Sequence, residues 1–305
     1  MTSTHSTDRP QVSLVIPIRN EAGNIGSLIN EIRTSLDTAG FSWEILVIND
    51  GSTDGSVDEV ESLSGDTSRI HLIHLTDGRG KSAALSRGFA RVRGESVVML
   101  DGDGQDDPSE IPKMLTRLGM APDGQKAPPA EAELVNGWKT PRLDPWHKTM
   151  PSRVFNLLVS WLTNVSLHDH NCGLKAMHRE VAQRLPLATG MHRFIPVLAA
   201  SSGNRIVEQP VHHRPRTQGV SKYGFGRFFR GLFDLGSVWL KLQTGQLSIA
   251  NHKDSLVDST AHLRKFMYGI LALVACSSVL GRIATVTTVD RLALEKRLVQ
   301  EAIQR

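Results

Sequence analysis

The stretch that decides the fold is VVMLDGDGQDDP, residues 97–108, in which an apolar run ends directly in acidic residues. A short apolar run bounded by turn residues is typical of a buried strand. Ligand sites of open α/β sheets lie beyond the carboxyl ends of such strands. Asp101 and Asp103 are two residues apart, so in an extended chain their side chains point to the same side. The pattern predicts a functional loop at a strand tip, with an acidic solvent loop as the plain alternative.

Asp101 and Asp103 have the chemistry to hold a divalent cation. Two carboxylates placed close together repel each other unless a cation lies between them. Hard oxygen ligands select Mg²⁺ or Mn²⁺, which usually complete their coordination with substrate phosphates. We therefore expect Mg²⁺ or Mn²⁺ at this pair, beside a phosphate-bearing substrate.

Strands and helices alternate on both sides of this stretch. Apolar, often β-branched runs predict strands at residues 12–18, 44–48, 69–75, 95–100, 133–138 and, as an extended segment, 205–216. Apolar residues at helical spacing predict helices at residues 22–36, 81–92 and 152–162. Strands that alternate with helices indicate a doubly wound, mostly parallel α/β sheet.

Composition narrows the class of protein. The chain has 305 residues, of which 40% are hydrophobic and 22% charged, so global disorder is excluded. Two cysteines, Cys172 and Cys276, exclude a disulfide scaffold and favour a reducing, cytoplasm-facing compartment. Residues 1–11 are polar and lack the apolar centre of a signal peptide, so we expect a disordered leader.

Charge is divided unevenly between the two halves of the chain. Residues 1–135 carry 12 Lys and Arg against 21 Asp and Glu, a net charge of −9. Residues 136–305 carry 23 against 10, a net charge of +13. Such asymmetry indicates two electrostatic roles: an acidic half suited to a metal, and a basic half suited to phosphate, nucleic acid or an anionic membrane. Scattered surface charge on an ordinary globule is the plain alternative.

The C-terminal part carries three amphipathic or apolar segments. Residues 225–242 alternate aromatic residues with cations, which suits a helix in a membrane interface or one packed on its own domain. Residues 266–281 are uncharged but shorter than the roughly 20 apolar residues that a bilayer span needs, and we favour a membrane anchor over a buried helix. Residues 289–305 resemble a charged amphipathic helix suited to self-association, which makes a homo-oligomer a candidate assembly.

Three other motifs are rejected on spacing or context. GRGKS at residues 78–82 lacks the first glycine of a P-loop, since Leu75 stands there. Residues 50–61 match the ligand positions of a calcium loop, as in a calcium-binding or scaffold protein, but a strand-like run precedes them instead of a helix. His168, His170 and His178 surround Cys172 at no spacing known for zinc.

Several motifs, in this order, resemble the family 2 glycosyltransferases of the GT-A fold. They are VSLVIPIRNEAGNI, EILVINDGSTDGS, GRGKSAALSRGF and VVMLDGDGQDDP. Three later stretches resemble the branch that contains dolichol-phosphate mannose synthase and bacterial polyprenyl-phosphate glycosyltransferases: NGWKTPRLDP, LHDHNCGLKAMHRE and HRPRTQGVSKYG. The resemblance covers residues 12–239, most of the chain.

The resemblance implies a GT-A domain over residues 12–242 and a helical, membrane-associated extension over residues 243–305. It implies an inverting enzyme that moves a hexose from a nucleotide sugar, of the GDP-mannose or UDP-glucose type, to a polyprenyl phosphate such as dolichyl or undecaprenyl phosphate. Its partners would be the donor, the lipid acceptor and the cytoplasmic face of a membrane, held peripherally or by a single anchor, and not nucleic acid. The alternative is a glycan or small-molecule hydroxyl as acceptor, which needs a carboxylate base. Candidates for that base are Asp106, Asp107 and Asp169.

The resemblance also implies roles for individual residues. The nucleotide-sugar-binding positions are Pro17, Arg19, Glu21, Asn49, Asp50, Lys81 and Gly102. The metal positions are Asp101, Asp103 and Gln105, with Asp101 and Asp103 also the catalytic pair. The acceptor-phosphate positions are Arg142, Ser152, Arg153, Arg216, Ser221 and Lys222. Arg19 and Asn49 depart from the family pattern, which leaves the base of the nucleotide open.

Overall fold

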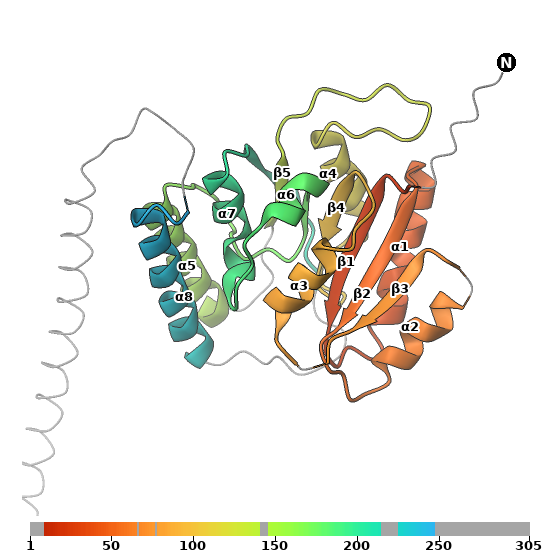
Figure 1. The fold of residues 1–305 in the computed structure, drawn as a ribbon, viewed down its shortest axis with the longest axis horizontal. Coiled ribbons are helices and arrows are strands. Elements are labelled where there is room, and N and C mark those ends of the chain that lie inside the picture. Colours follow the sequence, from red (N-terminus) through yellow and green to blue (C-terminus); the bar gives the residue numbers. More distant parts are fainter. Residues whose placement is uncertain (1–8, 66, 77, 141–145, 215–224, 248–305) are drawn as a thin grey trace, which may run out of the picture. The chain divides into compact units, whose positions relative to one another are not determined.

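The strands form one seven-stranded sheet in the order β3-β2-β1-β4-β6-β5-β7 (Figure 1). Their bounds are β1 Val12–Ile18, β2 Trp43–Asn49, β3 Ile70–His74, β4 Ser96–Met99, β5 Leu134–Lys139, β6 Lys175–His178 and β7 Ile206–Val211. β1 pairs parallel with β2 and β4, β2 with β3, and β5 with β7, whereas β6 runs antiparallel to β4 and β5. The prediction of a mostly parallel sheet is confirmed, and β6 is an additional strand that the sequence pattern did not predict.

This computed structural model describes residues 9–65, 67–76, 78–140, 146–214 and 225–247, without the side chains of 146–151 and 225–229. All of these residues belong to one compact unit, Met1–Ala250. Of the predicted leader, residues 1–8 lie outside the described residues, whereas Gln11 at its end is held in place, with its N–H donating to the carbonyl oxygen of Ser42 at 3.0 Å. The candidate anchor at 266–281 and the tail at 289–305 also lie outside the described residues, and the domain boundary after residue 242 stays a prediction. Within the described ranges, no helix combines the length and hydropathy needed to cross a membrane.

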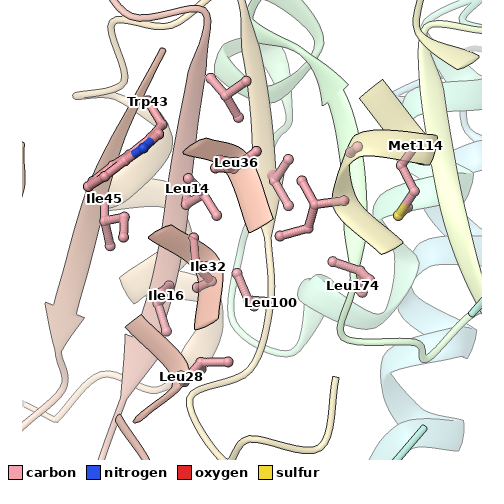
Figure 2. Packing of buried hydrophobic residues seen from close by; sticks show 14 of the residues in the cluster. Leu14, Ile16, Leu28, Ile32, Leu36, Trp43, Ile45, Leu100, Met114 and Leu174 are labelled. Carbon is pink, nitrogen blue, oxygen red and sulfur yellow. The ribbon is translucent and has the colours of Figure 1, made fainter. Parts of the chain in front are cut away.

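The helices cover both faces of the sheet. Their bounds are α1 Ile25–Ala39, α2 Ser56–Ser64, α3 Lys81–Phe89, α4 Ile111–Arg117, α5 Trp146–Thr163, α6 Arg179–Arg184, α7 Ile195–Ser201 and α8 Phe225–Gln243, with short 3₁₀ turns at Pro108–Glu110 and Met191–Phe194. Successive residues of a strand point to opposite faces of a sheet. Leu14 and Ile16 accordingly pack in one cluster with α1 (Figure 2), and Val15 packs in a second cluster with Phe89 of α3.

A third apolar cluster joins α5 to α8. Phe155 and Val159 of α5 pack with Leu235 and Val238 of α8 and with Phe194. The two helices lie side by side (Figure 1). The helices predicted at 152–162 and 225–242 are therefore present, and each buries one apolar face within this unit.

Candidate active site at the carboxyl edge of the sheet

Two segments meet at the carboxyl edge of the sheet, the loop after β4 and the start of α3. β4 ends at Met99, and Asp101 and Asp103 follow it directly. Lys81, the first residue of α3, forms an ion pair with Asp101, with its ammonium on Oδ1. The structure thus brings together the acidic pair and the basic residue assigned to the donor diphosphate, although 20 residues separate Lys81 from Asp101 in the chain.

The Lys81 ammonium sets the charge state of Asp101. Burial raises the pKa of this carboxyl group, but Lys81 outweighs burial, helped by Lys139 and His192, and the pKa falls to about 2. Asp101 is therefore a full anion at neutral pH. Asp103 lies in the same turn, where its Oδ1 accepts a hydrogen bond from the backbone N–H of Gln105 at 3.2 Å.

The start of α3 depends on a glycine. Gly80 has a φ of +85°, a backbone conformation that side chains other than glycine rarely adopt. In this conformation its N–H donates a 2.9 Å hydrogen bond to Oδ2 of Asp50, at the carboxyl end of β2. The contact fixes where α3 begins and hence the position of Lys81 beside Asp101.

The predicted donor residues also gather at this edge. Gly102 packs directly on β1: a Cβ atom there would lie 2.8 Å from Cγ2 of Ile18 and 3.4 Å from the carbonyl oxygen of Pro17. Such a Cβ atom would also lie 3.6 Å from Cγ of Glu21. The Arg19 side chain extends toward residue 78, since a Cβ atom on Gly78 would lie 3.4 Å from its Nη1.

Asn49 and Asp50 differ in how their side chains are used. The Asn49 amide spans the end of β2: its Oδ1 accepts from the N–H of Ser52 at 2.9 Å, and its Nδ2 lies 3.2 Å from Nδ1 of His74. Oδ1 of Asp50, by contrast, is buried and has no hydrogen-bond partner among the described residues. Asp50 thus has one buried oxygen that the described contacts leave without a hydrogen-bond partner, whereas the Asn49 amide serves the turn.

The acidic residues of the stretch 50–61 support the neighbouring turn. Oδ2 of Asp54 accepts from the N–H of Ala22 at 3.1 Å, and Glu59 accepts from the N–H groups of Gly23 and Gly26. Carboxylates engaged with backbone N–H groups are poor candidates for calcium ligands. A strand, β2, precedes the stretch, as the sequence pattern predicted.

Two groups at this edge were missed as site residues by the sequence analysis. Gly173, just before β6, packs against the acidic loop, because a Cβ atom there would overlap Oδ2 of Asp106 and lie 3.0 Å from Cγ of Asp101. Lys139, at the end of β5, places its Nζ 3.8 Å from Oδ1 of Asp106. The only sequence signal for Lys139 is its position at the end of a predicted strand. No sequence signal identifies Gly173 as part of the site.

Replacing Gly173 by alanine is expected to disturb the acidic loop. The added methyl group overlaps the carboxylate of Asp106 and crowds that of Asp101, and overpacking of this kind costs about 1–3 kcal/mol. Chemical denaturation measures this loss. Gly236→Ala is the matched control: a Cβ atom there meets nothing within 4 Å, and alanine in a helix is favourable by up to about 1 kcal/mol. Equal stability of the two variants would contradict the packing described here.

The predicted acceptor-phosphate residues fall into two groups. Ser152 and Arg153 lie on α5, and Arg153 is exposed. Arg142, Arg216, Ser221 and Lys222 lie outside the described residues. The structure therefore does not test whether these six residues form one site.

Of the carboxylates weighed as bases for a hydroxyl acceptor, Asp107 is paired with Arg214 at 2.9 Å, and Asp169 is buried.

The histidines around Cys172 have separate partners. His168 pairs with Glu208 at 2.8 Å and stacks on Trp138, with ring centroids 4.1 Å apart. His170 is buried beside Ser160, with Nε2 3.1 Å from its hydroxyl oxygen. Burial raises the pKa of the Cys172 thiol to about 12, so it is neutral at physiological pH. In the described part of the chain, no group of three or more His, Cys, Asp or Glu side chains is arranged to hold a metal.

Acid is expected to destabilise the protein through His170. Burial, and after it the Lys175 cation, lower the pKa of His170 to about 4. The unfolded chain takes up this proton near the ordinary pKa of about 6.5, so stability is lost as the pH falls from 6.5 toward 4. From pH 6.5 to 4.5 this residue accounts for about 2 kcal/mol of the loss. Urea unfolding at both pH values measures it, and His170→Gln should show a shallower pH dependence. If the wild type and His170→Gln lost equal stability between the two pH values, His170 would not be the source of the loss.

The acidic pair has the right chemistry for a divalent cation. Asp101 is ionised and already in contact with a positive charge, the Lys81 ammonium. Mg²⁺ sites commonly use one or two carboxylates together with substrate phosphates instead of a cage of protein ligands. Two adjacent carboxylates fit such a shared site, and Gln105 lies two residues beyond them.

Comparison with known proteins identifies relatives in sequence and in fold. Residues 13–185 match the sequence profile described as glycosyl transferase family 2. A dodecaprenyl-phosphate galacturonate synthase from Rhizobium johnstonii is 34% identical over 232 residues. The match covers 75% of this chain and 66% of that protein, so the chain spans just under two thirds of the length of this relative.

Solved structures share the fold at lower identity. Glucosyl-3-phosphoglycerate synthase from Mycobacterium tuberculosis, in complex with Mn²⁺, UDP-glucose and phosphoglyceric acid, matches with a TM-score of 0.57 at 20% identity, over 80% of this chain and 82% of that one. A mannosyltransferase from Pyrobaculum calidifontis, in complex with GDP-mannose and Mn²⁺, matches with a TM-score of 0.53 at 22% identity, over 77% of this chain and 65% of that one.

Proposed function

The chain belongs to glycosyl transferase family 2, and on that premise we propose that it transfers a sugar from a nucleotide sugar to polyprenyl phosphate with inversion at the anomeric carbon. The observation that carries the proposal is the convergence of Asp101, Asp103 and Lys81 at the carboxyl edge of the sheet. The acceptor class is supported by the relative named as a dodecaprenyl-phosphate galacturonate synthase. The site of action that we propose is the cytoplasmic face of a membrane.

Asp101 and Asp103 would hold Mg²⁺ or Mn²⁺ together with the donor diphosphate. The bound ion would supply Lewis-acid neutralisation of the charge that grows on the leaving nucleoside diphosphate. Lys81 provides a fixed positive charge at the same place, and preorganised charges of this kind stabilise a transition state without having to reorient. Complexes of Mn²⁺ with UDP-glucose and with GDP-mannose in the structural neighbours support a divalent metal.

The acceptor phosphate would act as the nucleophile. A hydroxyl acceptor needs a general base to take its proton, whereas a phosphate is already anionic and needs only cations to bring it to the donor. The net charge of +13 in residues 136–305 suits such an acceptor. We propose Ser152 and Arg153 of α5, together with Arg142, Arg216, Ser221 and Lys222, as the residues that bind it.

Membrane association is supported by the exposed faces of α5 and α8. Val154, Leu157 and Trp161 of α5 are exposed at helical spacing, with Leu157 70% exposed, and Phe233 of α8 is 80% exposed. Arg153 and Arg230 are exposed on the same helices. Apolar residues bordered by cations on adjacent helices suit the surface of an anionic bilayer.

Adding charge to these faces is expected to weaken membrane binding. The double variant Leu157→Asp/Phe233→Asp should lower partitioning onto phosphatidylglycerol-containing vesicles by about tenfold or more. Each change removes apolar area that the bilayer would cover and adds an anion that the anionic lipids repel. Ser237→Asp, at an exposed position of α8, is the control for added charge alone. Vesicle sedimentation measures the effect. Wild-type partitioning by the double variant would show that these faces do not contact the bilayer.

The proposed function is tested by transfer into a lipid product. The purified protein is incubated with Mn²⁺, a polyprenyl phosphate and labelled UDP- or GDP-sugars, including a hexuronic acid donor. We expect chloroform-extractable label with at least one donor, lost when EDTA is added. Absence of extractable label with every donor, from protein shown to be folded, would contradict the proposal.

A further inference from the structure

Ser82 places a buried hydroxyl group at the start of α3, and the proposed transfer does not use it. Ser82 is the last residue of the GRGKS stretch, follows Lys81 directly and is 3% exposed. Its Oγ lies 2.9 Å from Nδ1 of His192 and accepts a 3.2 Å hydrogen bond from the backbone N–H of the same residue. A hydroxyl group offers one donor and two acceptor sites, so Ser82 can serve both atoms whichever tautomer the ring adopts.

His192 belongs to a turn that the fold holds on both sides. The turn is Met191–Phe194, and both of its end residues are buried in the apolar cluster that joins α5 to α8. Gly190, just before it, has a φ of +80°, and a Cβ atom there would overlap the carboxylate of Asp234. Arg193 pairs with the same carboxylate at 3.1 Å. The imidazole of His192 is therefore carried by a fixed support.

The helix α3 begins at a residue that has no side chain to cap it. Gly80 occupies the N-cap, where a serine, threonine, aspartate or asparagine side chain usually binds the first N–H groups of a helix. The N–H of Gly80 donates to Oδ2 of Asp50 at 2.9 Å, and two residues later Ser82 is tied to His192. Lys81 lies between these two contacts, which come from distant parts of the chain. Together they fix the point from which the Lys81 side chain starts.

The contact between Ser82 and His192 lies at the edge of the acidic site. The ammonium of Lys81, the residue before Ser82, pairs with Asp101. Burial raises the pKa of Asp101, whereas Lys81, Lys139 and His192 lower it, in that order. The His192 ring is therefore close enough to act on the same carboxylate that Lys81 contacts.

We propose that Ser82 and His192 are positioning residues of the donor site. Their hydrogen bond holds the first turn of α3, so that the Lys81 ammonium stays at Asp101 and faces the donor diphosphate. The inference rests on the proposed function in one respect, which is the role of Lys81 at the diphosphate. Neither Ser82 nor His192 acts as a metal ligand or as a base, and both act through Lys81.

The first test is the binding of free Mn²⁺, followed by electron paramagnetic resonance without nucleotide. An ammonium held at Asp101 competes with the ion, so Ser82→Ala should bind Mn²⁺ about threefold more tightly than the wild type, part of the effect of a whole charge. Alanine is the best helix former, so this variant should stay folded. In a chain that carries Lys81→Met, adding Ser82→Ala should change the affinity by less than about twofold, because no ammonium is left to position. A purely structural hydroxyl group would have the same effect in both backgrounds.

The second test is sugar transfer to polyprenyl phosphate in the presence of Mn²⁺. Ser82→Ala and His192→Leu should each lower kcat/KM by about tenfold to a hundredfold, the cost of a misplaced catalytic group. His192→Asn is the conservative variant: it places an amide atom about where Nδ1 lies, and it should keep most of the activity. The matched control is Ser160→Ala, which removes the hydroxyl group 3.1 Å from Nε2 of His170. This control should change neither Mn²⁺ affinity nor transfer by more than about twofold, because distant sites are independent.

The other outcomes separate this inference from the proposed function. Unchanged Mn²⁺ affinity of Ser82→Ala, or an equal gain in the Lys81→Met background, would overturn the positioning role. An equal loss of transfer in His192→Asn and His192→Leu would also overturn it. The expected Mn²⁺ result without any transfer to polyprenyl phosphate would support the positioning role and refute the acceptor class. Absence of Mn²⁺ binding by the wild type would refute the metal pair and the inference together.

Discussion

Asp103→Ala is expected to lower kcat/KM for sugar transfer by about 10³-fold or more. The reason is the loss of one of two carboxylates that would hold the ion and the leaving diphosphate, and charge stabilisation of this kind contributes several kcal/mol to a transition state. Stability should change little, because removing one of two neighbouring anions relieves repulsion in the absence of metal. Turnover and the unfolding midpoint are therefore measured on the same preparation.

The matched control for Asp103→Ala is Glu110→Gln. Glu110 lies a few residues further along the chain, where it pairs with Lys113 at 3.0 Å. Its loss removes one negative charge near the loop without touching the acidic pair, so activity should stay within about twofold, as for most exposed ion pairs. An active Asp103→Ala variant would contradict the role given to Asp103, and an unfolded one would contradict the expected stability.

Lys81→Met is expected to move two measurements in opposite directions. Lys81 forms an ion pair with Asp101, so without it the acidic pair should bind free Mn²⁺ about tenfold more tightly, the effect of one fixed charge in a partly screened site. Transfer should nevertheless fall by about 10²–10³-fold, because the cation that we propose to face the leaving diphosphate is lost. Electron paramagnetic resonance titration of Mn²⁺ without nucleotide measures the first effect, and kcat/KM the second.

Arg87→Met is the control for Lys81→Met, because it removes an exposed cation from the last turn of the same helix. It should change neither Mn²⁺ affinity nor turnover appreciably. Weaker Mn²⁺ binding by Lys81→Met would show that Lys81 supports the metal site instead of competing with the ion. Normal turnover by Lys81→Met would show that Lys81 does not act in the donor site.

Local sequence patterns predicted much of the sheet. β1 coincides with the apolar run 12–18, and five apolar residues lie buried at helical spacing in α1, within the helix predicted at 22–36: Ile25, Leu28, Ile29, Ile32 and Leu36. These elements bury one or both faces, so their hydrophobic period reports their structure directly. The acidic loop was also placed correctly after β4, because a buried strand leads into it.

β6 escaped prediction because it is short and places a lysine in the core. Lys175 is 1% exposed, and its ammonium donates to the carbonyl oxygens of His170, at 3.3 Å, and Cys172. A lysine in a four-residue segment reads as a surface loop unless its carbonyl partners are known. Both carbonyl groups lie in the turn just before β6, and the hydrophobic periodicity of the sequence carries no information about that turn.

The contacts around Asp106 could not be predicted for a different reason. Lys139, Gly173 and His213 meet Asp106 from three separate segments, and each meeting depends on the order of β4, β6, β5 and β7 in the sheet. Local sequence carries no record of that order. Asp106 was therefore weighed only as a base for a hydroxyl acceptor, whereas the structure shows it paired with Lys139.

We propose that the nucleophile is a lipid phosphate, which reacts through its own negative charge with a donor held at Asp101 and Asp103. The most direct measurement compares polyprenyl phosphate with the matching polyprenol and with glycan hydroxyl acceptors, using one donor and saturating Mn²⁺. We expect rapid formation of a β-linked sugar phosphodiester from polyprenyl phosphate, and no product from polyprenol or from the glycan acceptors. Faster transfer to a hydroxyl acceptor, abolished by replacing a single carboxylate such as Asp106 or Asp169, would contradict it.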